Sequence, residues 1–137
     1  MSSITVPNHL LLPFVITLLI VIFMIFLRKT VFRNKKILWA SLLVFFLIYL
    51  FLVGGALYED IYLQWNLAKY DLNKNGFFEV NEMTPSQIEL SQRLVNDVGR
   101  NFIIITGLLF SLGISVVVFL IGIVFEKYKK LKIIETK

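Results

Sequence analysis

Residues 37–57 read ILWASLLVFFLIYLFLVGGAL, and this stretch decides how the chain folds. It contains no charged side chain, and a hydrocarbon core of ~30 Å is crossed by roughly 20 apolar residues in a helix, so the stretch is long enough to span a bilayer. A helix buried in a soluble core would show a polar face, which this stretch lacks. We therefore predict a transmembrane helix over residues 37–57.

Similar runs lie on both sides of this stretch. Residues 10–27 carry no charge, and neither do residues 101–125, whose apolar part begins at Phe102. Of the 137 residues, 58% are hydrophobic and 17% are charged. Soluble domains average roughly 45–50% apolar and about 25% charged residues, so this composition excludes a disordered chain and disfavours a soluble fold. We predict one all-α membrane unit, residues 1–137, with three transmembrane helices.

Charge predicts how these helices are oriented. The linker 28–36, RKTVFRNKK, is basic and contains no acid, and the tail 126–137 is rich in Lys. Short basic segments stay on the cytoplasmic side of a membrane. We therefore expect a multi-pass integral membrane protein with the linker and the tail in the cytoplasm, and with the N-terminus and residues 58–100 outside it. The positive charge then reflects topology and contact with membrane lipids, so nucleic acid is not an expected partner.

The extracytoplasmic segment contains the stretch DLNKNGFFEVNE, residues 71–82. It fits the pattern D-x-[DN]-x-[DN]-G followed by five residues and Glu. The stretch resembles the calcium loop of the EF-hand family, and the resemblance covers these residues only. It implies that Gly76 makes the sharp turn and that Ca²⁺ is bound by oxygens from six residues: Asp71, Asn73, Asn75, Phe77, Glu79 and Glu82. The alternative is a polar turn in which Asn and Gly serve only the backbone.

Two of these ligands are Asn, so few carboxylates would face the ion and its affinity would be weak. Extracellular modules bind calcium at about 10⁻⁴–10⁻³ M, which makes a structural ion compatible with this location. EF-hand units usually work in pairs, and this chain has one loop. The resemblance therefore implies a homodimer or a partner protein that supplies a second surface.

The residues that flank the loop predict helices. Thr84 followed by Pro85 is typical of an N-cap and a first helical residue, and apolar positions recur at helical spacing on both sides of the loop. We expect the second and third spans to continue outside the membrane as the two arms of a helical hairpin, residues 58–100, with the EF-hand-like loop at its tip. Three polar residues where the third span meets the outer interface are candidates for contact with a partner: Asp97, Arg100 and Asn101. The alternative is a solvated cluster at the interface, in which Asp97 and Arg100, three positions apart, form an intrahelical pair.

No ionisable residue occurs inside the three spans. Proton relays and ion pathways normally place such residues in the bilayer, so a pump or a coupled transporter is not expected. The third span does carry small residues on one side, which would let another helix approach closely: Gly107, Ser111, Ser115 and Gly122. Gly54 and Gly55 of the second span are candidates to receive this strip; the alternatives are a partner protein and ordinary glycine usage in membrane helices.

Catalytic chemistry has little support in this sequence. Cys is absent, His9 is the sole histidine, and no nucleophile–base pair is evident, so we expect neither an enzyme nor a small-molecule substrate. The first hypothesis is an accessory or assembly subunit with a structural calcium site, acting through helix–helix and hairpin contacts with other membrane proteins. A bacterial immunity-type protein against a pore-forming toxin and a subunit of an oligomeric channel or transporter are the alternatives.

Overall fold

A computed structural model describes residues 4–73, 75–80 and 82–135 of this chain, and within them the regular structure is entirely helical. The helices are α1 (Asn8–Leu27), α2 (Lys36–Leu67), α3 (Pro85–Asn96) and α4 (Val98–Glu135). Three stretches are long and apolar enough to cross a membrane: Asn8–Leu27, Lys36–Leu67 and Pro85–Ile134. The prediction of an all-helical fold with three helices long and apolar enough to span a membrane is thus confirmed for the described residues.

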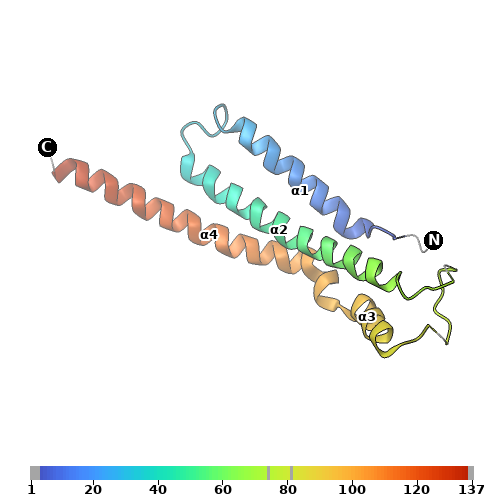
Figure 1. The fold of residues 1–137 in the computed structure, drawn as a ribbon. Coiled ribbons are helices and arrows are strands. Elements are labelled where there is room, and N and C mark those ends of the chain that lie inside the picture. Colours follow the sequence, from blue (N-terminus) through green and yellow to red (C-terminus); the bar gives the residue numbers. More distant parts are fainter. Residues whose placement is uncertain (1–3, 74, 81, 136–137) are drawn as a thin grey trace.

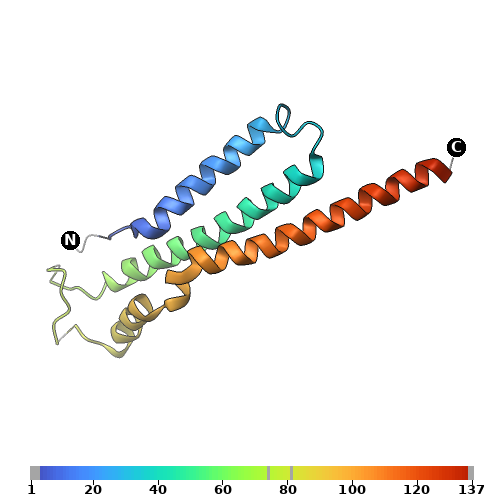
Figure 2. The ribbon, with the colours of Figure 1, turned by 180° about the vertical axis from the view of Figure 1, so that it is seen from behind.

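The central helix of the molecule is α2, which packs against each of the other three helices. Figures 1 and 2 show α1 running antiparallel to α2 on one side and α4 running along its other side. Leu10, Ala56 and Leu57 form a small buried cluster, against which Phe14 and Ile103 pack. Many of the other large apolar side chains in α1 and α4 are exposed, as expected of surfaces that face lipid.

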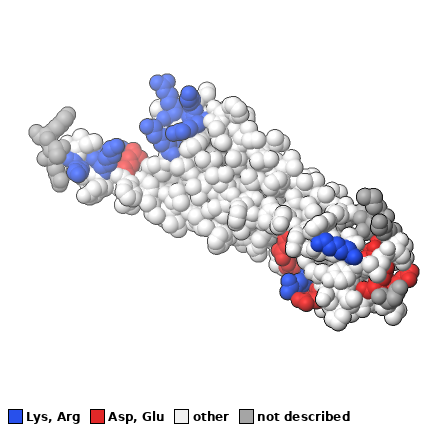
Figure 3. Space-filling model, in the orientation of Figure 1, with Lys and Arg blue, Asp and Glu red and all other residues white. Residues whose placement is uncertain are grey.

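Charged residues separate to the two ends of the molecule. Figure 3 shows Lys and Arg gathered at the end that holds the α1–α2 linker and the C-terminal part of α4, and most acids at the opposite end. The start of α1 and the loop between α2 and α3 lie together at this acidic end (Figure 1). Both basic segments therefore lie at one end of the bundle, as a common cytoplasmic location would require.

The small residues of α4 face α2 of the same chain. Gly107 lies against the ring of Tyr49, since a Cβ there would come 3.6 Å from two ring carbons. Ser111 is fully buried, and the hydroxyl of Ser115 donates a hydrogen bond of 2.8 Å to the backbone oxygen of Ser41. Close approach of the two backbones is what small side chains permit in a membrane, where no hydrophobic force drives helices together.

The expectation that Gly54 and Gly55 receive this strip is wrong. Gly54 faces α1, where a Cβ would come 2.9 Å from Cε2 of Phe14, and no described atom lies within 4 Å of the corresponding position at Gly55. Helix α2 is shared between two neighbours, so its two sides serve different helices. The side that carries Ser41 and Tyr49 receives α4, and the glycines lie off that side.

The second arm of the expected hairpin is not a straight continuation of the third span. The helix is interrupted at Asp97, whose backbone has φ −78° and ψ 84°, and α3 lies to the side of α4 (Figure 1). The carboxylate of Asp97 accepts a hydrogen bond from the backbone N–H of Arg100 at 2.9 Å. Asp is a preferred N-cap because its side chain satisfies a free N–H of the first turn, so Asp97 ends one helix and starts the next.

The start of α3 agrees with its sequence signal. Thr84 is the N-cap, its hydroxyl accepts a hydrogen bond of 3.2 Å from the N–H of Gln87, and Pro85 is the first helical residue. The predicted cap is therefore confirmed.

Gly122 gives a direct test of the α2–α4 contact. A Cβ there would come 2.5 Å from Cγ2 of Ile37, so Gly122→Val should push the two helices apart and lower the free energy of unfolding by about 1–3 kcal/mol. No described atom lies within 4 Å of the same position at Gly113, which makes Gly113→Val a matched control on the same helix. Thermal unfolding in detergent measures both variants, and equal stability of the two would contradict the contact.

Candidate metal site

The candidate site lies in the loop between α2 and α3, at the acidic end of the molecule. Its first residue, Asp71, is 5% exposed. One carboxylate oxygen accepts a hydrogen bond of 3.1 Å from the N–H of Asn75, and the other accepts one of 3.0 Å from the N–H of Gly76. Gly76 has φ +84°, a conformation that glycine adopts without strain. The chain therefore turns tightly around the Asp71 carboxylate.

Glu82 closes the loop from its other end. Its side chain is buried, with the residue 3% exposed, although it lies outside the membrane spans. One carboxylate oxygen accepts from the N–H groups of Leu72 at 2.9 Å and Asn73 at 3.3 Å, and the other accepts from the N–H of Glu79 at 3.2 Å. These charge-assisted bonds join residues ten positions apart and hold the beginning and the end of the loop together.

Glu79 and the two Asn residues meet between these ends. One oxygen of Glu79 accepts from the side-chain amides of Asn73, at 3.1 Å, and Asn75, at 3.2 Å. The side-chain oxygens of these Asn residues accept from the backbone N–H groups of Asn75 and Phe77, at 3.0 and 2.7 Å. The side chain of Phe77 is exposed. All six predicted ligand residues thus belong to one folded loop, and five of them are joined to one another by hydrogen bonds of their side chains.

The atoms of this loop that could bind a metal ion are carboxylate, amide and carbonyl oxygens, the hard ligands that calcium prefers. Among the described residues, no group of three or more His, Asp or Glu side chains is arranged to hold a metal ion. The carboxylates alone are therefore not a metal cluster as they stand, and an ion would also need the amide and backbone oxygens of the loop. Within the part of the chain that the structure describes, no Lys or Arg forms an ion pair with Asp71, Glu79 or Glu82, so their charge is available to a cation.

A buried ion pair lies between this loop and the membrane spans. Nε of Arg100, at the start of α4, lies 3.3 Å from Oδ1 of Asp60 in α2, and the Arg100 side chain is 2% exposed. Nη1 of Arg100 lies 4.0 Å from Oδ2 of Asp97, and Nη2 donates to the backbone oxygen of Leu94. Nε and Nη1 are close enough for ion pairing but make no hydrogen bond with the described residues. One guanidinium therefore connects α2, α3 and α4.

Hydrogen bonds connect this ion pair to the segment that precedes α1. The side-chain amide of Gln64 donates to the other oxygen of Asp60 at 2.6 Å and to the backbone oxygen of Thr5 at 2.8 Å. The backbone N–H of Thr5 donates in return to Gln64 at 2.8 Å. This network, at the acidic end of the molecule, consists of Thr5, Asp60, Gln64, Asp97 and Arg100.

Sequence reasoning missed Asp60 and Gln64. The available signal was periodicity, because Asp60 lies at helical spacing from the buried residues Ala56, Leu57, Leu63 and Leu67. An acid on a buried stripe needs a partner, since a buried charge without one is costly. Of the three residues predicted to contact a partner protein, Asp97 and Arg100 make these internal contacts, while Asn101 is exposed.

Comparison with known proteins gives no match: no family model, curated protein or solved structure matches this chain.

Proposed function

We propose that this protein is a non-enzymatic accessory or assembly subunit of the membrane, and that its loop 71–82 holds a structural calcium ion outside the cytoplasm. The observation that carries the proposal is the closure of the loop between the buried carboxylates of Asp71 and Glu82. Two buried anions held by backbone N–H groups in one short loop suit a cation that adds the missing positive charge.

Calcium suits this loop better than a transition metal. The loop offers oxygen donors only, whereas zinc and copper favour imidazole and thiolate ligands. The EF-hand resemblance assigns the remaining positions to Asn73, Asn75, Glu79 and the carbonyl of Phe77. With three carboxylates in the set we expect a dissociation constant of about 10⁻⁴–10⁻³ M, which extracellular calcium modules also show.

Exposed apolar residues of the same loop support a role in assembly. Leu72, Phe77, Val80 and Met83 are all exposed, although the loop lies beyond the apolar spans. Exposed apolar surface outside a membrane span marks contact with another protein or with the membrane surface. A calcium ion would fix the loop backbone and thereby the positions of these side chains, so ion binding and partner binding would be linked.

A calcium titration of the purified protein tests the ion site. A ligand that binds only the folded state stabilises it, and 10 mM calcium should add about 1.4–2.7 kcal/mol for a dissociation constant of about 10⁻³–10⁻⁴ M. Differential scanning fluorimetry in detergent should therefore show a rising melting temperature with calcium and a much smaller rise with magnesium, which demands stricter octahedral geometry.

Asp71→Asn is the informative variant for this titration. It removes one charge and places an amide donor toward the N–H of Asn75 or Gly76, so calcium affinity should fall at least tenfold, about 1.4 kcal/mol. Glu59→Gln is the matched control, because Glu59 is an exposed acid of α2 with the same charge change. An unchanged calcium response in Asp71→Asn, or no response in the natural chain, would reduce the loop to a polar turn.

Assembly is tested separately in mild detergent. Native electrophoresis with calcium or with a chelator should show a larger complex, either a homodimer or a heteromer, that depends on the loop. Replacing the exposed residues Val80 and Met83 by Ser, neither of which is assigned as a ligand, should release this complex while the monomer keeps its calcium affinity. A monomer under both conditions would contradict the assembly role and leave the ion site unaffected.

A further inference from the structure

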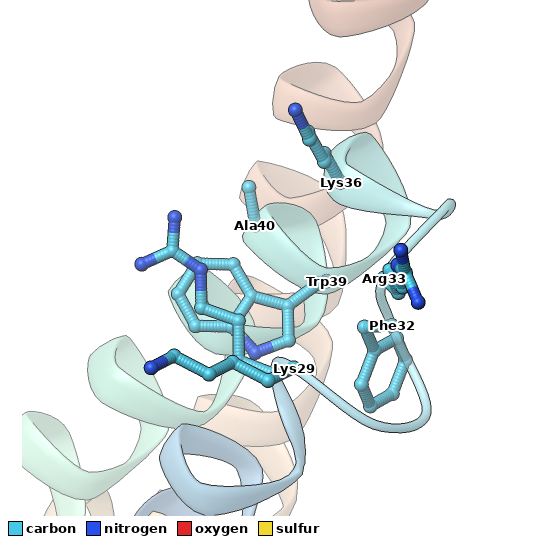
Figure 4. A pocket seen from close by; sticks show the side chains of 7 residues that line it. Lys29, Phe32, Arg33, Lys36, Trp39 and Ala40 are labelled. Atoms are coloured by element: carbon cyan, nitrogen blue, oxygen red, sulfur yellow. The ribbon is translucent and has the colours of Figure 1, made fainter.

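The turn between α1 and α2 encloses a pocket of about 550 Å³ at the basic end of the molecule. Figure 4 shows Lys29, Arg33 and Lys36 arranged around Phe32 and Trp39 at this turn. Arg28, the first residue after α1, completes the cationic lining. Ligand pockets commonly have roughly 300–1,000 Å³, so the space accommodates a small polar group.

No acid among the described residues forms an ion pair with the cations of this pocket. The linker 28–36 contains no Asp or Glu. Within the described part of the chain, Arg28, Lys29, Arg33 and Lys36 form no ion pair, whereas Arg93 and Lys130 each pair with a nearby Glu. The four cations line the same pocket and their side chains are exposed, so an anion bound there would be attracted by all of them.

One wall of the pocket is held in place. The indole N–H of Trp39 donates a hydrogen bond of 3.1 Å to the backbone oxygen of Met24 in α1, which fixes the ring across the two helices. The guanidinium of Arg28 lies over that ring, with its carbon 4.7 Å from the ring centre. A guanidinium held in this way is positioned to bind a phosphate through two parallel hydrogen bonds.

The position of the pocket relative to the bilayer restricts which ligands it can bind. It lies where the apolar helix α1 ends and the apolar helix α2 begins, so in a bilayer it would lie at the level of the headgroups. Trp is typical of this interface. Phe32 and Trp39 add apolar surface beside the cations, which a soluble phosphate would not use but which the glycerol and upper acyl chains of a lipid would contact.

We propose that this pocket is a binding site for the phosphate of one anionic phospholipid, with Arg28, Lys29, Arg33 and Lys36 around the phosphate and Trp39 beside the glycerol backbone. The site is distinct from the calcium loop, which lies at the opposite end of the bundle. It would anchor the α1–α2 turn at the membrane surface and fix the depth of the protein in the bilayer.

The test uses Trp39 as its reporter. The chain has two Trp residues, and Trp65→Phe leaves Trp39 as the single tryptophan, which can be excited selectively over the five Tyr residues. The protein is reconstituted in phosphatidylcholine nanodiscs that contain a small fraction of phosphatidylglycerol brominated near the top of its acyl chains, because bromine quenches indole on contact. Quenching of Trp39 should saturate at a low fraction of brominated phosphatidylglycerol. At equal fractions, this quenching should exceed the quenching by brominated phosphatidylcholine.

Two double variants that remove the same amount of charge test whether the pocket residues bind the lipid. Arg33→Gln with Lys36→Gln should weaken binding of the brominated phosphatidylglycerol about 30-fold, since each basic residue near the lipid surface contributes about fivefold in affinity. Lys127→Gln with Lys129→Gln removes the same charge from exposed positions of the tail and should leave binding unchanged. Nanodiscs with identical leaflets make the result independent of any change in topology.

Three outcomes would overturn the proposal. Equal quenching by brominated phosphatidylcholine would show that the pocket does not select the anionic headgroup. Equal weakening by the tail variant would show diffuse attraction rather than a site. Displacement of the brominated phosphatidylglycerol by sub-millimolar inorganic phosphate or glycerol 3-phosphate would assign the same residues to a soluble phosphate instead of a lipid.

Discussion

Arg100→Met is expected to lower the free energy of unfolding by about 3–5 kcal/mol, the typical effect of removing one partner of a buried ion pair. The substitution keeps a side chain of similar length but leaves the carboxylate of Asp60 buried without its cation. The backbone oxygen of Leu94 also loses its donor. Because this guanidinium connects three helices, we expect the whole acidic half of the bundle to loosen.

Urea or thermal unfolding in detergent measures this effect, and Arg93→Met is the matched control. Arg93 pairs with Glu89 on the surface of α3, and both side chains are largely exposed. Exposed pairs contribute about 0–1 kcal/mol, so the control should change stability little. Similar losses in the two variants would mean that Arg100 is not enclosed as the structure places it.

A double substitution separates burial from specific pairing. Replacing both partners, Asp60→Leu with Arg100→Met, removes the buried charges together, and such changes are often neutral or stabilising. We therefore expect the double variant to recover much of the stability that Arg100→Met loses. Hydrogen exchange at Thr5 would show whether the N-terminal segment remains attached, since Asp60 also accepts from Gln64. No recovery would indicate that the geometry of the network matters more than its buried charge.

Glu82→Ala is expected to disorder the loop 71–82 even without calcium. The carboxylate of Glu82 accepts three backbone hydrogen bonds, and a buried donor left without an acceptor costs about 1–3 kcal/mol. The loop can relieve this cost by opening to water, so we expect local unfolding while the three spans remain packed. Exchange of the amide hydrogens of Leu72 and Glu79 should accelerate at least tenfold, and calcium should no longer raise the melting temperature.

Glu89→Ala is the control for this result. Glu89 is a neighbouring acid on α3, and its side chain is exposed and bonded only to Arg93 at the surface. The same loss of charge should leave both the exchange rates of the loop and the calcium response unchanged. Full calcium affinity in Glu82→Ala would show that Glu82 is not a ligand, while slow exchange in that variant would show that it does not close the loop.

The sequence was sufficient for the spans and for several local signals. The length and apolarity of residues 10–27, 37–57 and 101–125 predicted three spanning helices, because crossing a bilayer depends on a run of neighbouring residues. The cap at Thr84 depends on Gln87 three positions away, and the turn at Gly76 depends on one residue with positive φ. Each of these features depends on residues that are close together in the sequence, so the local sequence pattern is enough to predict it.

Only the tertiary structure decided which helix faces meet. Asp60 and Arg100 form an ion pair because α2 and α4 pack in one particular register, and the sequence around each residue does not encode that register. For the same reason Gly54 was assigned to the wrong neighbour, and the local sequence did not indicate that Trp39 is fixed to Met24 of α1 as the wall of a pocket. Contacts between helices depend on rotation and offset, which are set by the sum of many weak packing interactions along both surfaces.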